Sequence, residues 1–174
     1  MVFNMKNLVD FIPTYEDFPK KGISFKDVLE ILQEPEIFRE LILKMSSNQI
    51  IKNSQAIISI DARGFIFGSA IALQSSKPIL FARKPGKLPG KLIKQKYKLE
   101  YGENVISIQK KAINKYDSFS IVDDLIATGG TARSVSQLLQ KEKKIITGLL
   151  TVVDLKEFSD REKFDFPVDS LIKL

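Results

Sequence analysis

Asp123 and Asp124 stand between an apolar stretch that predicts a strand and the turn Ala127-Thr128-Gly129-Gly130-Thr131. Backbone N–H groups at the start of a following helix can converge on one phosphate, and the helix dipole favours a negative charge there. The hydroxyl groups of Thr128 and Thr131 add two further donors. Two carboxylates would repel a lone phosphate. The pattern therefore predicts a ligand that carries, besides a phosphate, groups that carboxylates can bind.

Ribose hydroxyls and a hydrated Mg²⁺ are partners that suit the Asp123–Asp124 pair. The turn is not a P-loop, because the Gly-Lys-Ser/Thr ending is missing. A ligand with a 5-phosphate, a free 2,3-diol and a metal-bound diphosphate matches every one of these groups, and we therefore predict phosphoribosyl pyrophosphate. The alternative is a strand-to-helix turn with two solvated aspartates. This alternative would explain an isolated Asp-Asp or an isolated Thr-Gly-Gly. It does not explain the full succession of apolar strand, acid pair, glycine turn and amphipathic helix.

The composition narrows the chemistry of this chain. Its 174 residues favour a single domain, 1–174, and 44% hydrophobic with 28% charged residues is typical of a globular protein. It has no cysteine and no histidine, which excludes thiolate chemistry, Ser-His-Asp triads and Cys- or His-bound metals. The net charge of +6 indicates either a polyanionic partner or a lysine-rich solvated surface. The absence of a signal or membrane segment predicts a cytoplasmic protein.

Short apolar segments alternate with helical patterns along the chain. This alternation predicts an α/β fold, with a central parallel sheet of about five strands covered by helices on both faces. In such a sheet, ligands bind beyond the carboxyl ends of the strands, where the acid pair and the turn would lie. The alternating residues 94–108 predict a β-hairpin instead. Predicted strands are 56–60, 79–82, 118–122 and 145–153, and predicted helices are 64–74, 131–143 and one that begins near Pro35.

The stretch IVDDLIATGGT resembles the phosphoribosyl-pyrophosphate motif of the type I phosphoribosyltransferase family. The resemblance covers roughly residues 14–163 and is closest to the branch that uses adenine. It implies an enzyme of purine salvage that transfers phosphoribosyl to adenine, gives AMP and pyrophosphate, uses Mg²⁺ and forms a homodimer. Four further stretches carry it in order and spacing: EDFPKKGISFKDV (16–28), IDARGFIFGSAIA (60–72), RKPGKLPG (83–90) and YKLEYGENVISIQKKAI (97–113).

The residue at position 127 bears on the choice of base. In the hypoxanthine–guanine branch of the family, an acidic residue at this position acts at the purine. Ala127 can neither accept nor donate a proton, which disfavours a 6-oxopurine. Two alternatives stay open: a phosphoribosyltransferase for another purine, and a regulator of this fold that binds nucleic acid. The residues before the motif region are too few for a helix-turn-helix, so we expect no nucleic-acid partner.

Arg63 follows a predicted strand and stands at the start of a helix, where a cation is unfavourable against the dipole. Its planar donors match phosphoryl oxygens, and the resemblance places it in the pyrophosphate loop. The run from Arg83 to Lys98 has seven basic residues and no acidic one. We expect Arg83, Lys84 and Lys87 to hold the leaving diphosphate, while a solvated face is an equal alternative for the later lysines. In the family, this loop meets the neighbouring subunit.

The resemblance makes the hairpin a flexible lid, about 91–109, that excludes water from the reacting sugar. Glu100 is expected to handle protons at the purine, so that Glu100 and Arg63 are the candidate catalytic residues. The alternative for Glu100 is a lysine-paired charge on an exposed hairpin. Tyr101 either packs on the lid or contacts the sugar phosphate.

The N-terminal part, about 1–33, is expected to form a hood over the base. By the resemblance, Phe25 stacks on the purine, backbone groups around Ser24 and Lys26 recognise the adenine edge, and Leu155 covers the opposite face. Core packing is the alternative for Phe25 and Leu155. The family more often has arginine at position 26 and proline at position 21, where this chain has lysine. A backbone contact survives that change, whereas a side-chain contact at position 26 need not.

Overall fold

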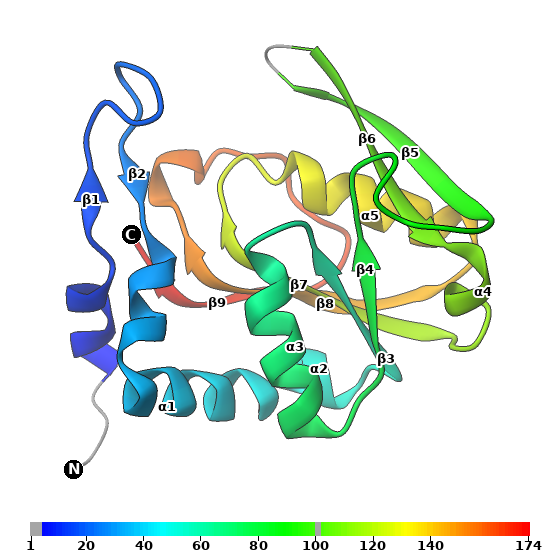
Figure 1. Ribbon diagram of the computed structural model, residues 1–174, viewed down its shortest axis with the longest axis horizontal. Helices are drawn as coiled ribbons and strands as arrows, with labels where there is room; N and C mark the ends of the chain where they lie inside the picture. The colour runs from blue at the N-terminus through cyan, green and yellow to red at the C-terminus, as the bar shows by residue number, and fades with distance from the viewer. Residues whose placement is uncertain (1–4, 100–101) are drawn as a thin grey trace.

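The computed structural model describes residues 5–99 and 102–174, and its centre is a five-stranded parallel sheet (Figure 1). The strand order is β4-β3-β7-β8-β9, and every neighbouring pair runs parallel. This arrangement confirms the predicted α/β fold class. The strands are β3 (Ala56–Ile60), β4 (Ile79–Ala82), β7 (Ser118–Ile126), β8 (Ile145–Asp154) and β9 (Val168–Lys173).

Helices cover both faces of this sheet. Successive side chains of a strand point to opposite faces, so each central strand presents apolar side chains to the helices on both sides. In β3, Ile57 packs into one hydrophobic cluster, whereas Ile58 and Ile60 pack into the other. The α-helices are α1 (Pro35–Ser46), α2 (Gln49–Lys52), α3 (Gly64–Ser75), α4 (Lys110–Ile113) and α5 (Gly130–Lys141), and the 3₁₀ helices are η1 (Met5–Phe11), η2 (Val28–Gln33) and η3 (Lys156–Phe158).

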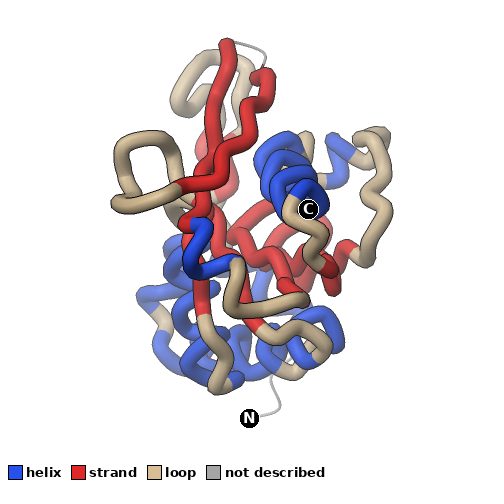
Figure 2. Tube along the Cα trace, turned by 90° about the vertical axis from the view of Figure 1, so that its right-hand side faces the viewer, coloured by secondary structure: helices blue, strands red, loops and turns tan. Residues whose placement is uncertain are grey.

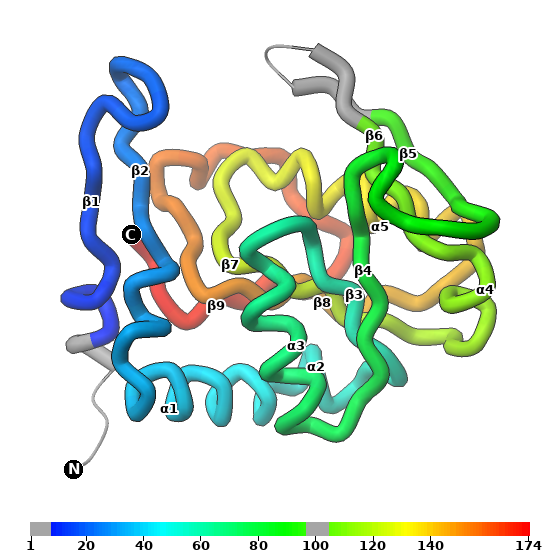
Figure 3. Tube along the Cα trace, in the orientation of Figure 1, coloured from blue at the N-terminus to red at the C-terminus, as the bar shows by residue number. Residues whose placement is uncertain are grey.

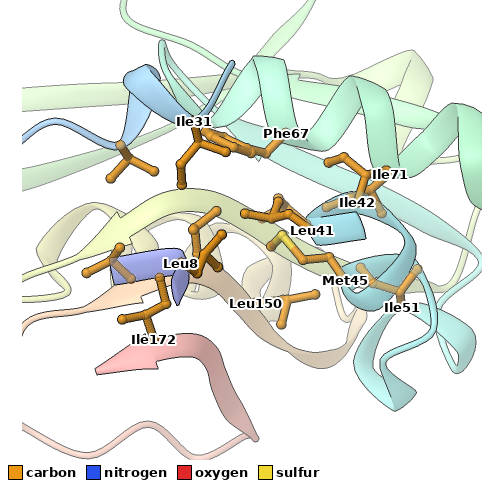
Figure 4. Close-up of a cluster of buried hydrophobic side chains, with 14 of the residues drawn as sticks. Leu8, Ile31, Leu41, Ile42, Met45, Ile51, Phe67, Ile71, Leu150 and Ile172 are labelled. Atoms are coloured by element: carbon orange, nitrogen blue, oxygen red, sulfur yellow. The ribbon is translucent and has the colours of Figure 1, made fainter. Parts of the chain in front are cut away.

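The first hydrophobic cluster joins α1, α2 and α3 to the sheet (Figure 4). Leu41 and Met45 from α1 and Phe67 from α3 are fully buried in it. Leu41 and Met45 are four residues apart and therefore lie on one face of α1. The second cluster packs α5 and the base of the long hairpin against the opposite face. Burial on both faces explains why the central strands are continuous apolar runs rather than alternating ones.

Two antiparallel hairpins stand on either side of the central sheet (Figures 1 and 3). One pairs β1 (Thr14–Tyr15) with β2 (Phe25–Lys26), and the other pairs β5 (Leu92–Leu99) with β6 (Gly102–Gln109). The β5–β6 pair extends away from the body of the molecule (Figure 2). Its base is attached to α5, where Lys141 Nζ donates to Gln95 Oε1 at 2.6 Å. The predicted hairpin is therefore confirmed.

Two features differ from the prediction. Strand β7 continues past Val122 to Ile126, because Leu125 and Ile126 pair in parallel with the end of β8. Asp123 and Asp124 are therefore part of the strand, whereas the predicted strand ended at Val122, before them. Strand β9 was not predicted, because it is an edge strand with only one fully buried residue and it lacks a continuous apolar run.

We expect Gly68→Ala to destabilise the fold by about 1–3 kcal/mol, as overpacking does in other cores. Gly68 packs α3 directly on β3, and a Cβ built on it would lie 2.4 Å from Ser59 Oγ and 2.7 Å from Ser59 Cβ. Urea unfolding measures the loss, and Ser69→Ala on the exposed side of the helix is the control. Adding Ser59→Gly removes both clashing atoms, so the double variant should be more stable than Gly68→Ala alone. A single variant as stable as the unaltered chain would contradict this packing.

Candidate active site

A cavity of about 450 Å³ opens where β3 and β7 end. The side chains that contribute its polar lining are Asp61, Arg63, Lys84, Asp123, Asp124 and Thr131. These side chains come from distant parts of the sequence. They meet because the carboxyl ends of parallel strands share one edge of the sheet. The expected acid pair and one end of the expected phosphate turn therefore face the same space.

The predicted phosphate turn connects β7 to α5. Gly129 caps α5 with a φ of 79°, a left-handed conformation that favours glycine. Its carbonyl accepts the first hydrogen bond of the helix from Arg133 N at 2.9 Å. A cavity of about 150 Å³ is lined by the turn residues Ala127 to Thr131 and by Asp123. The turn thus presents a helix N-terminus and two hydroxyl side chains beside the acid pair, which is suited to an anion.

Asp123 and Asp124 form a tightly packed pair. The Asp124 N–H donates to Asp123 Oδ1 at 2.9 Å, and Arg63 Nε lies 2.8 Å from Asp124 Oδ2. Gly64 leaves room for the pair, since a Cβ built there would lie 2.7 Å from Asp123 Oδ1. Burial raises the pKa of Asp123 well above its usual value, and the neighbouring Asp124 carboxylate raises it further. Burial also raises the pKa of Asp124, although the Arg63 guanidinium partly opposes that shift.

Arg63 connects the acid pair to the hood. It precedes α3, and its guanidinium carbon lies over the Phe25 ring, 5.2 Å from the ring centroid. This is within range of a cation–π interaction. The same side chain therefore contacts Asp124 on one side and the predicted base-stacking residue on the other.

The three predicted cations of the loop after β4 differ in their surroundings. Lys84 lines the cavity that contains Asp123 and Asp124. Arg83 pairs with Asp61, with 3.1 Å between Nε and Oδ2, and its guanidinium lies 5.4 Å from the Phe65 ring centroid. Lys87 is exposed, and its carbonyl accepts a hydrogen bond from Arg83 Nη1 at 3.3 Å. The structure thus brings Lys84 to the acid pair and gives Arg83 an acidic partner of its own.

A third cavity, of about 340 Å³, lies between the hood and the end of β8. Ser24, Phe25 and Lys26 line it together with Leu155 and Ala127, as expected for residues around one base. The Lys26 side chain is engaged within the β1–β2 pair, since Nζ donates to Oγ1 of its cross-strand partner Thr14 at 2.7 Å. The lining also includes residues that were not predicted, among them Glu157 and Phe158, two and three positions after Leu155. That nearness to Leu155 is their only signal in the sequence.

The remaining predicted residues concern the lid and the metal. Glu100 and Tyr101 lie outside the described residues. Within residues 5–99 and 102–174, no three acidic, histidine or cysteine side chains group closely enough to hold a metal ion by themselves. The Asp123–Asp124 pair offers oxygen ligands, which fit a Mg²⁺ ion that is carried largely by substrate phosphates.

A parallel sheet with an acid pair, a glycine turn and a basic loop at its carboxyl edge is the arrangement expected of a phosphoribosyltransferase. A model of the phosphoribosyl transferase domain family matches residues 26–171, and the chain belongs to this family. It is 65% identical over 170 residues to the adenine phosphoribosyltransferase of Prochlorococcus marinus (strain AS9601), covering 98% of this chain and 100% of the relative. The family resemblance inferred from the sequence is thereby confirmed.

Solved structures give the same result. The adenine phosphoribosyltransferase of Thermoanaerobacter pseudethanolicus matches with a TM-score of 0.89 and 32% identity, covering 98% of this chain and 100% of that one. The enzyme of Saccharomyces cerevisiae, solved with adenine and an imino-altritol bisphosphate, matches with a TM-score of 0.85 and 32% identity, covering 96% and 97%.

Proposed function

We propose that this chain is an enzyme of purine salvage that transfers phosphoribosyl from phosphoribosyl pyrophosphate to adenine and releases AMP and pyrophosphate. The observation that carries the proposal is the position of the Asp123–Asp124 pair. Asp123 shares a cavity with the glycine turn for a phosphate, and Arg63, which pairs with Asp124, also lines the cavity of the hood for a base. The relatives named adenine phosphoribosyltransferase, at up to 65% identity, support the choice of reaction.

Each part of the donor substrate has matching groups at the edge of the sheet. The turn from Ala127 to Thr131 binds the 5-phosphate through backbone N–H groups and the two threonine hydroxyls. Asp123 and Asp124 accept hydrogen bonds from the ribose hydroxyls. The leaving diphosphate is held by Arg63, Arg83, Lys84 and Lys87, and the Lys84 position in the main cavity supports this most directly.

The transfer itself is a substitution at the anomeric carbon. A purine nitrogen forms a bond to that carbon while the bond to the diphosphate oxygen breaks, and pyrophosphate leaves with the electron pair. Positive charge develops on the sugar, and the carboxylates of Asp123 and Asp124 stabilise it. The purine proton passes to a base, for which Glu100 on the lid is the candidate. Most of the acceleration comes from orientation and charge stabilisation rather than from covalent catalysis.

Magnesium is the proposed cofactor. Asp123 and Asp124 would hold it together with the diphosphate and the ribose oxygens of the substrate. When bound, the ion neutralises negative charge on the departing diphosphate.

Adenine is proposed as the base because of the residues around the third cavity. Phe25 supplies an aromatic face, Leu155 lies across the cavity, and backbone groups near Ser24 and Lys26 recognise the purine edge. Ala127 also lines this cavity and has no proton to exchange with a 6-oxo group. The structure of the yeast relative with adenine shows that a protein of this fold accommodates this base.

The wider organisation of the enzyme follows from the same resemblance. We propose a single domain, 1–174, with a hood at about 1–33 and a lid at about 91–109. A homodimer is the proposed assembly, and the exposed apolar side chains Ile66 and Leu73 on α3 support it. No helix within the described parts of the chain is long and apolar enough to cross a membrane. A cytoplasmic location is proposed.

The test is pyrophosphate release from phosphoribosyl pyrophosphate with Mg²⁺ and a panel of adenine, hypoxanthine and guanine. Adenine should give the highest kcat/KM, and omission of Mg²⁺ should remove most of the activity. Faster turnover of hypoxanthine or guanine would overturn the choice of base. Salt-dependent DNA binding without pyrophosphate release with any base would overturn the enzyme in favour of a regulator.

A further inference from the structure

The segment 159–167, near the C-terminus, contains no helix or strand and lies along α5. Two helix side chains, one near each end of α5, form hydrogen bonds to it. Gln140 Nε2 donates to Asp165 Oδ2 at 2.8 Å, and Arg133 binds the residues before Phe164. This part of the chain was not among the predicted site residues, yet it reaches the proposed phosphate turn.

Phe164 is the residue that touches the turn. A Cβ built on Gly129 would lie 3.0 Å from Phe164 Cζ and 3.3 Å from Cε2, so the ring edge closes the space behind Gly129. Gly129 is the left-handed residue that caps α5, and it has no side chain of its own to fix its position. The ring is half-buried and packs against the same hydrophobic cluster as α5.

Arg133 holds Phe164 in this place. Its guanidinium carbon lies 4.4 Å from the centre of the Phe164 ring, and Nη2 donates to the Glu162 carbonyl at 2.7 Å. Nη1 donates to the Lys163 carbonyl at 3.4 Å. The backbone N–H of the same residue donates to the Gly129 carbonyl. One residue therefore connects the turn, through its backbone, to the segment behind it, through its side chain.

We propose that Phe164 and Arg133 are positioning residues for the 5-phosphate, acting through Gly129 and without touching the substrate. The proposal rests on the proposed function of the turn. Backbone N–H groups bind an anion well only while they converge on it, and a small displacement of one group weakens every bond it makes. The ring behind Gly129 limits that displacement. Loss of the ring should therefore weaken the phosphate subsite and leave the diphosphate subsite intact.

The test compares Phe164→Leu with Phe166→Leu. The Phe166 ring lies 5.1 Å from that of Phe164 and packs against the same cluster, so both changes should cost similar stability. Only Phe164→Leu should raise the KM for phosphoribosyl pyrophosphate and the inhibition constant of ribose 5-phosphate, each roughly tenfold, as expected for loss of one good hydrogen bond to a charged group. The inhibition constant of pyrophosphate and the kcat should change much less. Arg133→Gln should show the same separation with a smaller effect.

The outcomes separate this proposal from the proposed function. If the unaltered chain releases no pyrophosphate with adenine, the function itself fails. If the unaltered chain is active but both leucine variants weaken ribose 5-phosphate equally, or neither does, the positioning role is overturned. It is also overturned if Phe164→Leu weakens ribose 5-phosphate and pyrophosphate by the same factor, because that result indicates general loosening of the site.

Discussion

Asp123→Asn should remove most of the activity and at the same time stabilise the folded chain at neutral pH. The activity falls because the sugar loses a carboxylate that stabilises its developing charge, and such losses amount to roughly 10²- to 10³-fold in turnover. The stability rises because the ionised carboxylate is unfavourable in this place. It is buried next to a second acid, Asp124, and both effects raise its pKa.

The gain in stability from Asp123→Asn should depend on pH, because the raised pKa of Asp123 makes its contribution to folding change with pH. An acid whose pKa is higher in the folded than in the unfolded chain contributes most stability below the unfolded value of about 3.9, and that contribution disappears as the pH rises through the folded pKa. Each unit by which the pKa is raised corresponds to about 1.4 kcal/mol. The gain from Asp123→Asn should therefore be absent in acid and reach its full size above the folded pKa.

Urea unfolding over a pH series, together with pyrophosphate release, measures both effects. Asp117→Asn is the matched control, because the Asp117 side chain is 82% exposed and pairs with Lys144 at the surface. The control should leave turnover unchanged and alter stability by less than about 0.5 kcal/mol. An Asp123→Asn variant that keeps its turnover, or that is less stable than the unaltered chain at neutral pH, would refute this description of the acid pair.

Arg63→Gln should reduce turnover by roughly 10²-fold, because the leaving diphosphate loses a guanidinium that matches its oxygens. It should have a second, opposite effect on adenine. In the structure, the guanidinium lies over Phe25 and pairs with Asp124, so it covers ring surface proposed for the purine. Adenine should therefore bind the variant at least as tightly as the unaltered chain when phosphoribosyl pyrophosphate is absent.

Calorimetric titration with adenine, alone and after addition of phosphoribosyl pyrophosphate, tests this pair of effects. The donor substrate should strengthen adenine binding to the unaltered chain more than to Arg63→Gln, because it draws the guanidinium away from Phe25. Arg39→Gln, an exposed change on α1, is the control for loss of one positive charge. Weaker adenine binding by Arg63→Gln in the absence of the donor would mean that Arg63 supports the base rather than covers its place.

The central strands and helices could be predicted because their residues obey simple periodicities. Strand 56–60 is fully buried, strand 79–82 is an apolar run that is buried or half-buried, and α3 begins at Gly64 as predicted. Strand β9 could not be predicted in this way, since only its pairing with β8 distinguishes it from a polar loop. The extension of β7 to Ile126 likewise depends on the length of its neighbour β8 and not on its own composition.

The site shows the same division between local and long-range information. The acid pair and the turn are adjacent in sequence, so their types and spacing indicated a ligand directly. The pairing of Arg83 with Asp61 and the approach of Phe164 to Gly129 arise only after folding. No local pattern distinguished Lys84, which lines the cavity, from its neighbour Arg83. Such contacts depend on side-chain directions that a sequence pattern does not contain.

A crystal structure with phosphoribosyl pyrophosphate and Mg²⁺ would show where the donor substrate binds. We predict the 5-phosphate on the backbone N–H groups between Thr128 and Thr131, with the ribose hydroxyls on Asp123 and Asp124. A fourth cavity, of about 420 Å³ and with Lys156, Arg161, Lys163 and Lys173 in its lining, offers a rival place for a polyanion. If the substrate binds in that cavity and not at the acid pair and the turn, the proposed site is contradicted.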